Sequence, residues 1–263
     1  MRNKNQVSRM MATTLEVKLS VVLLLTAAAA TIVFQFAWAQ SPLDNTSRIN
    51  IFPPDSDPYG LTFGNWTTKW SQWAYSIPTE NNPLIDDTGE NCSQAQNQTG
   101  PVWFLAGTAP GSVERTCTIS AGKAILFPVI NTMEFRLASE TEAELRAASK
   151  NNMDKVTSLE ASIDGMFLQN LSNYRVQSPA FNVTFPQDNV LGVPQGTYPA
   201  VGEGYWVFLE PLPPGQHQIH FRGTLVDPAA TSTTNFETEV SYDLGISDTG
   251  AMPTIEQAAN ATE

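Results

Sequence analysis

The stretch "GYWVFLEPLPPGQHQIHFRG", residues 204–223, combines two kinds of strand signal on either side of a proline-rich turn. Residues 204–212 are almost continuously apolar, which is typical of a strand buried on both faces, and Pro211 and Pro213 end that strand. In residues 215–223 apolar and polar side chains alternate, so one face is predicted to be buried and the other to meet solvent. The stretch therefore predicts two strands, one central and one half-buried.

The residues on either side extend this strand pattern. "SLEASIDGMFL", residues 158–168, alternates before Asp164-Gly165, which is a hairpin-turn dipeptide. Residues 236–246 alternate throughout and predict a half-buried antiparallel strand. We therefore expect a mainly β fold with one or two short helices, and an antiparallel β-sandwich, Ig-like or jelly-roll-like, over residues 156–246.

The middle of the chain adds strands and one helix. "PVWFLAG" (101–107) and "AILFPVI" (124–130) are apolar runs suited to central strands, and residues 108–123 between them are predicted to form a loop or hairpin. Ser139 followed by Glu142 predicts a capping box that opens a helix reaching about Lys150, with Glu142 and Arg146 one turn apart.

A tryptophan-rich helix is predicted before these strands. In "FGNWTTKWSQWAYSIP", residues 63–78, the apolar residues recur at intervals of three and four, and Pro78 follows them. Three indoles left exposed on one stripe would create an apolar patch that soluble monomers rarely carry. We expect Trp66, Trp70 and Trp73 to be buried, and an exposed sugar-stacking platform is the alternative.

The two ends of the chain differ in composition from its middle. Residues 1–39 contain basic residues, an apolar run and an Ala-x-Ala pattern, which predict a signal peptide; an N-terminal membrane anchor is the alternative reading. Residues 40–62 are predicted to be an extended linker, residues 63–246 a single β-rich domain, and residues 247–263 a disordered tail. Both readings of the leader place the domain outside the cytoplasm, secreted or at the cell surface.

The cysteines and histidines limit the covalent and metal chemistry. An exported chain with only Cys92 and Cys117 is expected to join them in one disulfide. His217 and His220 lie three apart in a predicted strand, so they point to opposite faces and cannot share one metal ion. We therefore predict no metal site and no cofactor.

Charge and glycosylation signals narrow the class of partner. The net charge is −12, and four of the 14 basic residues lie in the leader, so nucleic acid is excluded as a partner. Seven Asn-x-Ser/Thr sequons suggest a glycoprotein; the one at Asn91 adjoins Cys92, which hinders its use. The remaining acceptor candidates are Asn45, Asn65, Asn97, Asn170, Asn182 and Asn260.

The ordered segments carry a family resemblance. The strings "NPLIDDTGENC", "GPVWFLAG", "AILFPVINT", "SIDG", "YRVQSPAF", "GYWVFLEPLPPGQHQIHFRG" and "VSYDLGI" resemble a family of exported, functionally uncharacterised microbial proteins, over about residues 63–246. Within them, "PPGQHQIHFRG" and the last alternating strand resemble the closing hairpin of Ig-like extracellular sandwiches. The resemblance implies location and fold, and it supplies no catalytic residue.

Two functions of different class remain open. The sequence contains no nucleophile elbow, zinc-protease motif, phosphate loop or dinucleotide fingerprint, which favours a binding or structural module at the cell surface. Its expected partner is a cell-surface protein or a glycan, and the membrane is a partner only if the leader is retained. The alternative is a secreted polysaccharide-active hydrolase with a carboxylate pair drawn from Asp87, Glu134 and Glu210. The acidic run around Asp86 could bind calcium, but a side-chain-stabilised turn explains it more simply.

Overall fold

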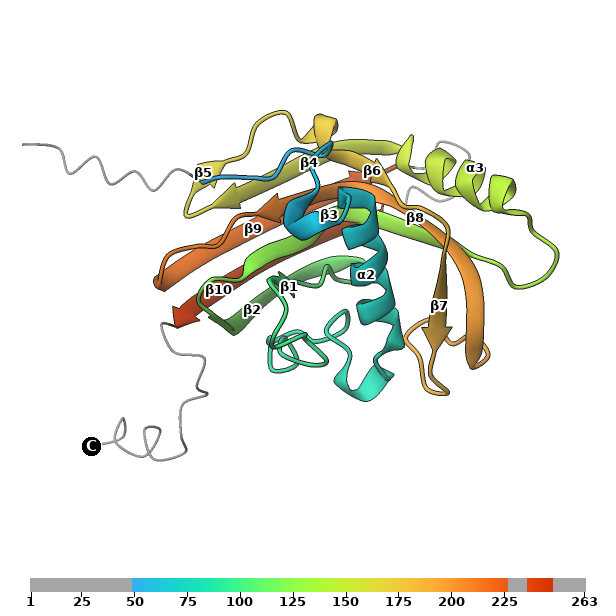
Figure 1. Cartoon of the computed structure of the whole chain (residues 1–263), viewed down its shortest axis with the longest axis horizontal. Helices are drawn as coiled ribbons and strands as arrows, with labels where there is room; N and C mark the ends of the chain where they lie inside the picture. The colour runs from blue at the N-terminus through green and yellow to red at the C-terminus, as the bar shows by residue number, and fades with distance from the viewer. Residues whose placement is uncertain (1–48, 227–235, 248–263) are drawn as a thin grey trace, which may run out of the picture. The chain divides into compact units, whose positions relative to one another are not determined.

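The computed structural model describes residues 49–226 and 236–247, and these residues form two facing mixed β-sheets with two α-helices (Figure 1). The predicted mainly β class and short helices are confirmed. Most of the described strand pairs are antiparallel, as expected for the sandwich, and each sheet also contains one parallel pair, so both sheets are mixed. None of the described helices is both long and apolar enough to cross a membrane.

The first sheet, sheet A, has the strand order β1-β3-β8-β6, and β7 also pairs with β8. Its strands are β1 (Val102–Phe104), β3 (Ala124–Phe135), β6 (Arg175–Gln177), β7 (Phe181–Phe185) and β8 (Gly196–Leu209). The apolar run of β3 is buried from Ala124 to Ile130, as predicted for a central strand. β1 is instead a three-residue edge strand parallel to β3, which corrects the central position expected for residues 101–107.

The second sheet, sheet B, has the order β2-β10-β9-β4-β5. Its strands are β2 (Gly111–Ser120), β4 (Val156–Ile163), β5 (Met166–Phe167), β9 (Gly215–Leu225) and β10 (Phe236–Ser247). The Asp164-Gly165 turn joins β4 to β5 with positive φ at both residues, as the hairpin prediction requires. β2 runs parallel to β10 and occupies the segment predicted to be a loop or hairpin, so the sandwich begins well before residue 156.

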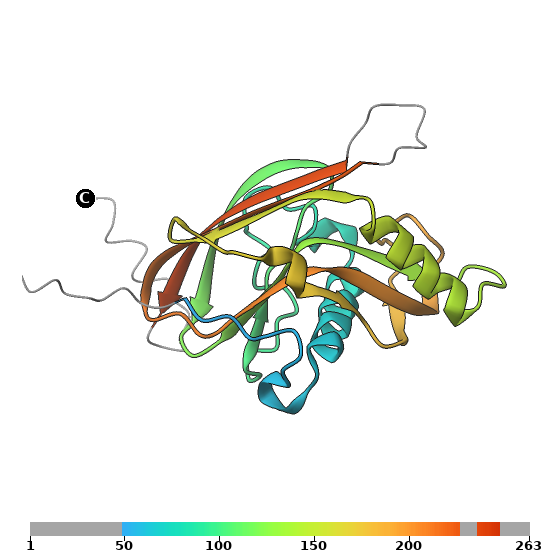
Figure 2. The same ribbon diagram turned by 90° about the horizontal axis from the view of Figure 1, so that it is seen from above.

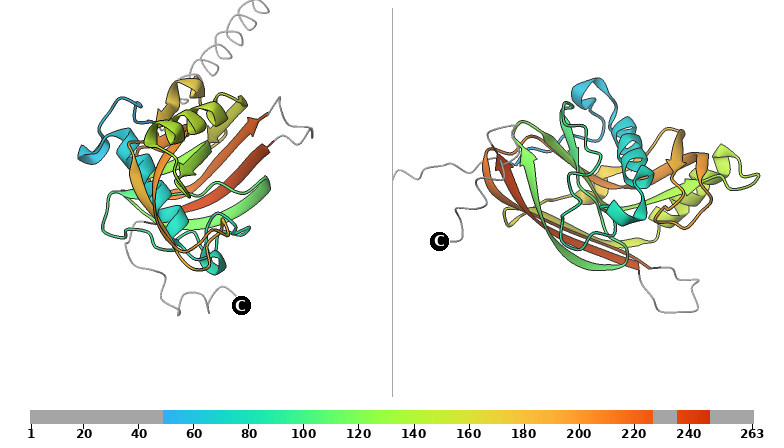
Figure 3. Two further views of the ribbon diagram at one scale, coloured as in Figure 1. Left: turned by 90° about the vertical axis from the view of Figure 1, so that its right-hand side faces the viewer. Right: turned by 90° about the horizontal axis from the view of Figure 1, so that it is seen from below.

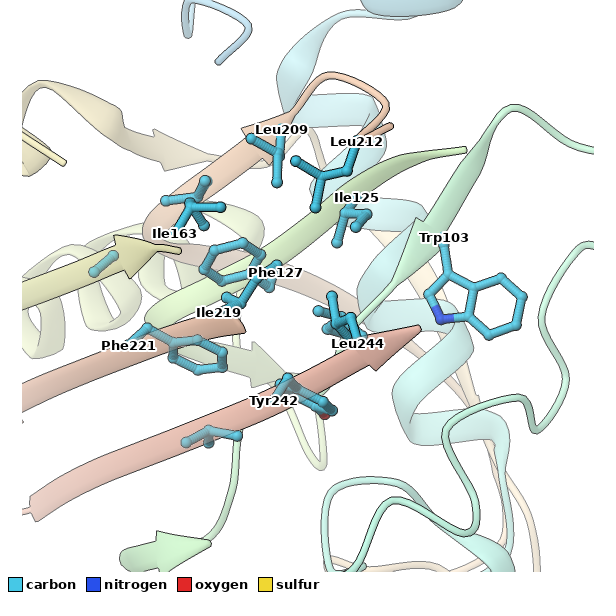
Figure 4. Close-up of a cluster of buried hydrophobic side chains, with 14 of the residues drawn as sticks. Trp103, Ile125, Phe127, Ile163, Leu209, Leu212, Ile219, Phe221, Tyr242 and Leu244 are labelled. Carbon is cyan, nitrogen blue, oxygen red and sulfur yellow. The ribbon is translucent and has the colours of Figure 1, made fainter. Parts of the chain in front are cut away.

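The core of the sandwich lies between the two sheets. Inward-facing side chains of β3 and β8 meet those of β9, β10 and β4, and Phe127 stacks on Phe221 with ring centroids 4.8 Å apart (Figure 4). The alternating residues of β9 and β10 supply this face because successive side chains of a strand point to opposite sides. The alternation predicted for both strands is confirmed.

Helix α2 (Phe63–Ser76) covers the other face of sheet A, opposite sheet B (Figure 3). Trp70 is fully buried and Trp66 and Trp73 are each 7% exposed, so the predicted buried stripe is confirmed and the sugar platform is ruled out. Each indole N–H donates to a different segment: Trp66 to Pro58 O, Trp70 to Leu105 O and Trp73 to Gln94 O. The helix thus fastens three loops to sheet A.

Helix α3 (Glu142–Met153) packs on β3 and β8 at one end of sheet A (Figure 2). Its capping box is formed by Thr141 and Glu144, two residues after the predicted pair, because the chain has not yet turned into helix at Ser139. The predicted contact between Glu142 and Arg146 is present at 2.8 Å. Short 3₁₀ turns complete the described elements: η1 (Pro58–Gly60), η2 (Thr79–Asn81) and η3 (Leu171–Tyr174).

The described residues before α2, 49–62, include a turn and the 3₁₀ element η1, and they are held against the domain. Ile51 bridges to Leu209, and the Phe52 N–H donates to Phe208 O, so these residues lie beside the end of β8. The Phe52 ring also contacts the Phe208 ring edge-on at 5.0 Å. The predicted leader, the first part of the predicted linker and almost all of the predicted tail lie outside the described residues.

Candidate functional site

A pocket of about 370 Å³ lies beside β3, next to the segment between the end of β1 and the start of β2. Its volume falls within the range of ligand-binding pockets, about 300–1,000 Å³. We call it the edge pocket and define it by its lining residues: Tyr75, Leu84, Ile85, Gly107–Ala109, Pro128–Met133, Phe135, Val190, Leu191, Phe236 and Thr238.

The pocket exists because β1 is much shorter than β3. β1 pairs with residues 124–126 of β3, and the Leu105 N–H still donates to Leu126 O. The chain then crosses to sheet B, held there by the buried guanidinium of Arg115, which donates to the carbonyls of Ala106 and Gly107 at 3.0 Å. From residue 127 to 135, no described strand lies on this side of β3.

The six consecutive residues 128–133 all line the pocket, and this indicates that the pocket meets β3 edge-on. Alternate side chains of a strand point to opposite faces, so a pocket over one face would contact only every second residue. The edge of a strand carries its backbone N–H and C=O groups. The wall formed by β3 therefore includes main-chain donors and acceptors.

The ladder between β3 and β8 identifies which of these groups face the pocket. The Arg136 N–H donates to Pro199 O across the ladder, and the Ser178 N–H donates to Gly202 O on the far side of β8. The backbone groups of Gly202 therefore point away from β3. Met133 lies directly opposite Gly202, so the two do not bond to each other, and the N–H and C=O of Met133 point away from β8. By the same alternation, Asn131 also directs its N–H and C=O toward the pocket.

At the start of this edge, before the bulge, the other set of alternate residues faces the β1 side. Before the bulge between Pro128 and Ile130, the even-numbered residues of β3 face the β1 side, as the bonds of Ala124 and Leu126 show. Pro128 is the next residue in that set and has no N–H to offer. The bulge then shifts the pattern by one residue. A proline within a strand is confined to edges and bulges, so Pro128 was the sequence signal for this site.

The pocket is lined by uncharged side chains only, although the whole chain carries a net charge of −12. Burial, reinforced by the nearby Glu134 carboxylate, raises the pKa of Tyr75 to about 12, so its phenol stays neutral. Thr238 Oγ1 exchanges hydrogen bonds with the Thr108 backbone at 3.3–3.4 Å, which satisfies that hydroxyl. Ile85 and Leu191 form an exposed apolar rim, 46% and 44% accessible.

The predicted disulfide is confirmed, and Cys117 belongs to the core of the sandwich. Cys92 and Cys117 are bonded with their Cα atoms 6.0 Å apart, and Cys117 is a buried residue of β2. The acidic turn before Cys92 is also explained. Both carboxylate oxygens of Asp86 accept bonds from Thr88, Gly89 and Asn91, which is the predicted side-chain-stabilised turn.

The proposed catalytic carboxylates are not brought together. Glu134 is paired with Val201 on β8, whereas Glu210 follows the last residue of that strand, nine positions and about 30 Å further along. A glycosidase pair needs carboxylates about 5–10 Å apart. Asp87 is an exposed turn residue beside Asp86. Glu134 and Glu210 therefore do not form the suggested carboxylate pair.

The histidines lie on opposite faces of β9, as predicted. His217 is held between Asp164 Oδ2 and the Pro213 carbonyl, each 2.8 Å from a ring nitrogen. His220 is on the outer face, 3.1 Å from Ser241 Oγ. No cluster of three His, Cys, Asp or Glu side chains suited to a metal ion occurs among the residues that the structure describes.

Comparisons with known proteins identify no family. No protein-family model and no curated protein sequence matches this chain. A solved structure described as "Structure of PbICP-C in complex with falcipain-2" matches with 9% identity, over 56% of this chain and 100% of that chain. Its TM-score is 0.21, so the likeness supports no statement about fold or function.

Proposed function

We propose that the protein is an exported, non-enzymatic β-sandwich that binds a partner through the edge pocket. The observation that carries the proposal is an uncharged pocket of about 370 Å³ with an apolar rim in a strongly acidic chain. Apolar clefts with a few placed polar groups are the usual form of a binding site. Membership of the exported microbial family remains part of this proposal.

Export and glycosylation are supported by the disulfide and by the exposure of several sequons. A structural disulfide persists in oxidising compartments. The side chains of Asn97, Asn170 and Asn182 are exposed, whereas Asn65 lies half-buried in the first turn of α2. Asn45 and Asn260 lie outside the described residues. Whether the leader is removed or kept as an anchor does not change the side of the membrane on which the pocket lies.

A protein partner fits the pocket better than a glycan does. Glycan sites commonly stack sugars on exposed aromatic rings, but the tryptophans of α2 are buried. The pocket wall combines the rings of Tyr75, Phe135 and Phe236 with aliphatic side chains and the open edge of β3, and it is this open backbone edge that favours a peptide. The hydrolase alternative loses its support because Glu134 lies opposite Val201 of β8, nine residues before Glu210 along the chain.

The test is binding of a neutral apolar fluorophore, N-phenyl-1-naphthylamine, to residues 40–263. We expect saturable fluorescence enhancement that Leu191→Asp weakens strongly, because a charge at the rim opposes entry of an apolar molecule. Leu137→Asp is the matched control, since Leu137 is 56% exposed and lies outside the pocket. Equal binding by the wild type and both variants, or no binding by any, would refute the proposed site.

A further inference from the structure

We propose that the edge pocket receives an extended, uncharged peptide segment, which adds to sheet A as a strand beside β3. This inference rests on the proposed function and names the partner's chemistry. Strand addition obtains its affinity from main-chain hydrogen bonds at an open sheet edge and its specificity from pockets for alternate side chains. The edge pocket offers both features.

The backbone groups are correctly placed for strand addition. Asn131 and Met133 both face the pocket, and their spacing of two residues matches the repeat of a β-ladder. In the described part of the chain, the strand that occupies this side of β3 stops at Phe104, opposite Leu126. An added strand would continue along the edge from that point.

The two walls of the pocket suit the alternate side chains of such a segment. Met133 and Phe135 pack with Tyr75 on the α2 side of sheet A. Ile130 lies toward sheet B, where it fills the space left by the missing Cβ of Gly223. Successive side chains of an added strand would therefore meet apolar surface on both sides, and a charged side chain would find no counter-charge among the lining residues.

The rest of the edge shows why an occupant is needed. Natural proteins protect open edges with lysine, proline, bulges or a covering segment. Pro128 and the bulge protect only the first part of this edge. Residues 131–135 carry no lysine and no proline, and their one charged side chain, Glu134, accepts bonds from Thr132 and Asn152 and does not line the pocket. An open edge of this kind is a template for pairing with another chain.

The experiment selects displayed random octapeptides on residues 40–263 and counter-selects them on the Leu191→Asp variant. We expect the enriched sequences to be uncharged and to alternate apolar with polar residues. Synthetic versions of the strongest binder are then N-methylated on one alternate set of amides or on the other. We expect one set to reduce affinity about tenfold or more, because it removes the bonds to β3, and the other set to have little effect.

Two protein variants test the same contact from the other side. Met133→Pro removes the N–H that faces the pocket and leaves the ladder to β8 intact, so peptide affinity should fall. Met133→Ala keeps that N–H and controls for the lost side chain. If Met133→Pro does not fold, amide hydrogen exchange on the wild type replaces it. Peptide should then slow exchange at Asn131 and Met133 and leave the paired Thr132 amide unchanged.

The outcomes separate this inference from the proposed function. Binding of the neutral fluorophore without enrichment of any peptide would overturn strand addition and leave a small-molecule site. Peptide binding that neither N-methylated set weakens would also overturn it, because the contact would not be a β-ladder. Failure of the fluorophore to bind would refute the pocket itself.

Discussion

Replacing Trp70 with alanine tests whether α2 is a buried scaffold. Trp70 is fully buried, its ring centroid lies 5.2 Å from that of Trp206, and its Nε1–H donates to Leu105 O. Large-to-small core substitutions at tryptophan cost about 3–5 kcal/mol, and a buried carbonyl left without its donor adds about 1 kcal/mol or more. We expect the free energy of unfolding to fall by about 4–6 kcal/mol.

The assay is thermal unfolding of residues 40–263 followed by circular dichroism. For a domain of this size, each kcal/mol lowers the melting temperature by about 2–4 °C, so Trp70→Ala should melt about 8–24 °C below wild type. Trp70→Phe keeps an aromatic ring but loses the indole N–H donor, so its melting temperature should lie between those of wild type and Trp70→Ala. Lys69→Ala is the matched control on the exposed face of the same helix. A Trp70→Ala melting temperature equal to that of the control would refute the burial argument.

Three further predictions concern the disulfide, an acidic turn and the sequons. Replacing Cys92 and Cys117 with alanine should lower the unfolding free energy by about 3.5 kcal/mol for a separation of 25 residues, and an unchanged urea midpoint would contradict this. Burial alone would raise the pKa of Asp86, but hydrogen bonds from Asn91, Thr88 and Gly89 outweigh it and lower the pKa below its ordinary value of 3.8. The stability that the folded carboxylate contributes is therefore present above about pH 4 and lost as the pH falls further. Asp86→Asn should be less stable than wild type at pH 7, and the difference in unfolding free energy should close in acid. A difference that does not depend on pH would exclude this account. Peptide mass spectrometry of the exported protein should find glycans at the exposed sequons and none at Asn65, and occupancy of Asn65 would contradict the buried position of Thr67 in that sequon. The exposed sequons of the described chain are Asn97, Asn170 and Asn182.

The spacing of apolar residues predicted those helices and strands that bury one regular face. The three-and-four spacing of residues 63–77 gave α2, and the alternation of residues 236–246 gave β10. β2 was missed because Arg115 occupies an inward position between Val113 and Cys117, which interrupts the apolar alternation. Only the fold shows that carbonyls from residues 86, 106 and 107 surround that guanidinium. A buried charge with distant partners leaves no short-range signature.

The edge pocket could not be predicted from periodicity alone. It depends on β1 pairing in parallel with only the first residues of β3, and on α2, β10 and three loops lying beside the exposed edge. Those are long-range facts about topology. Pro128 was visible within the apolar run 124–130 and pointed to an edge or bulge, but it did not indicate which side of the strand is open.

Because β2 pairs with β10, the last described strand, β2 cannot complete its ladder until almost the whole chain has been synthesised. β2 is complete early in the chain, yet its ladder partner is the last strand, and Arg115 meets Tyr242 across 127 residues of sequence. A nascent chain that emerges from its N-terminus must keep β2 unpaired until residues 236–247 have appeared. Such non-local pairing makes folding slow, and until β10 is available β2 is an unpaired strand that is prone to aggregate. A stop codon anywhere before β10 would therefore remove the neighbour of β2 as well as the final strand, and release a fragment prone to aggregate.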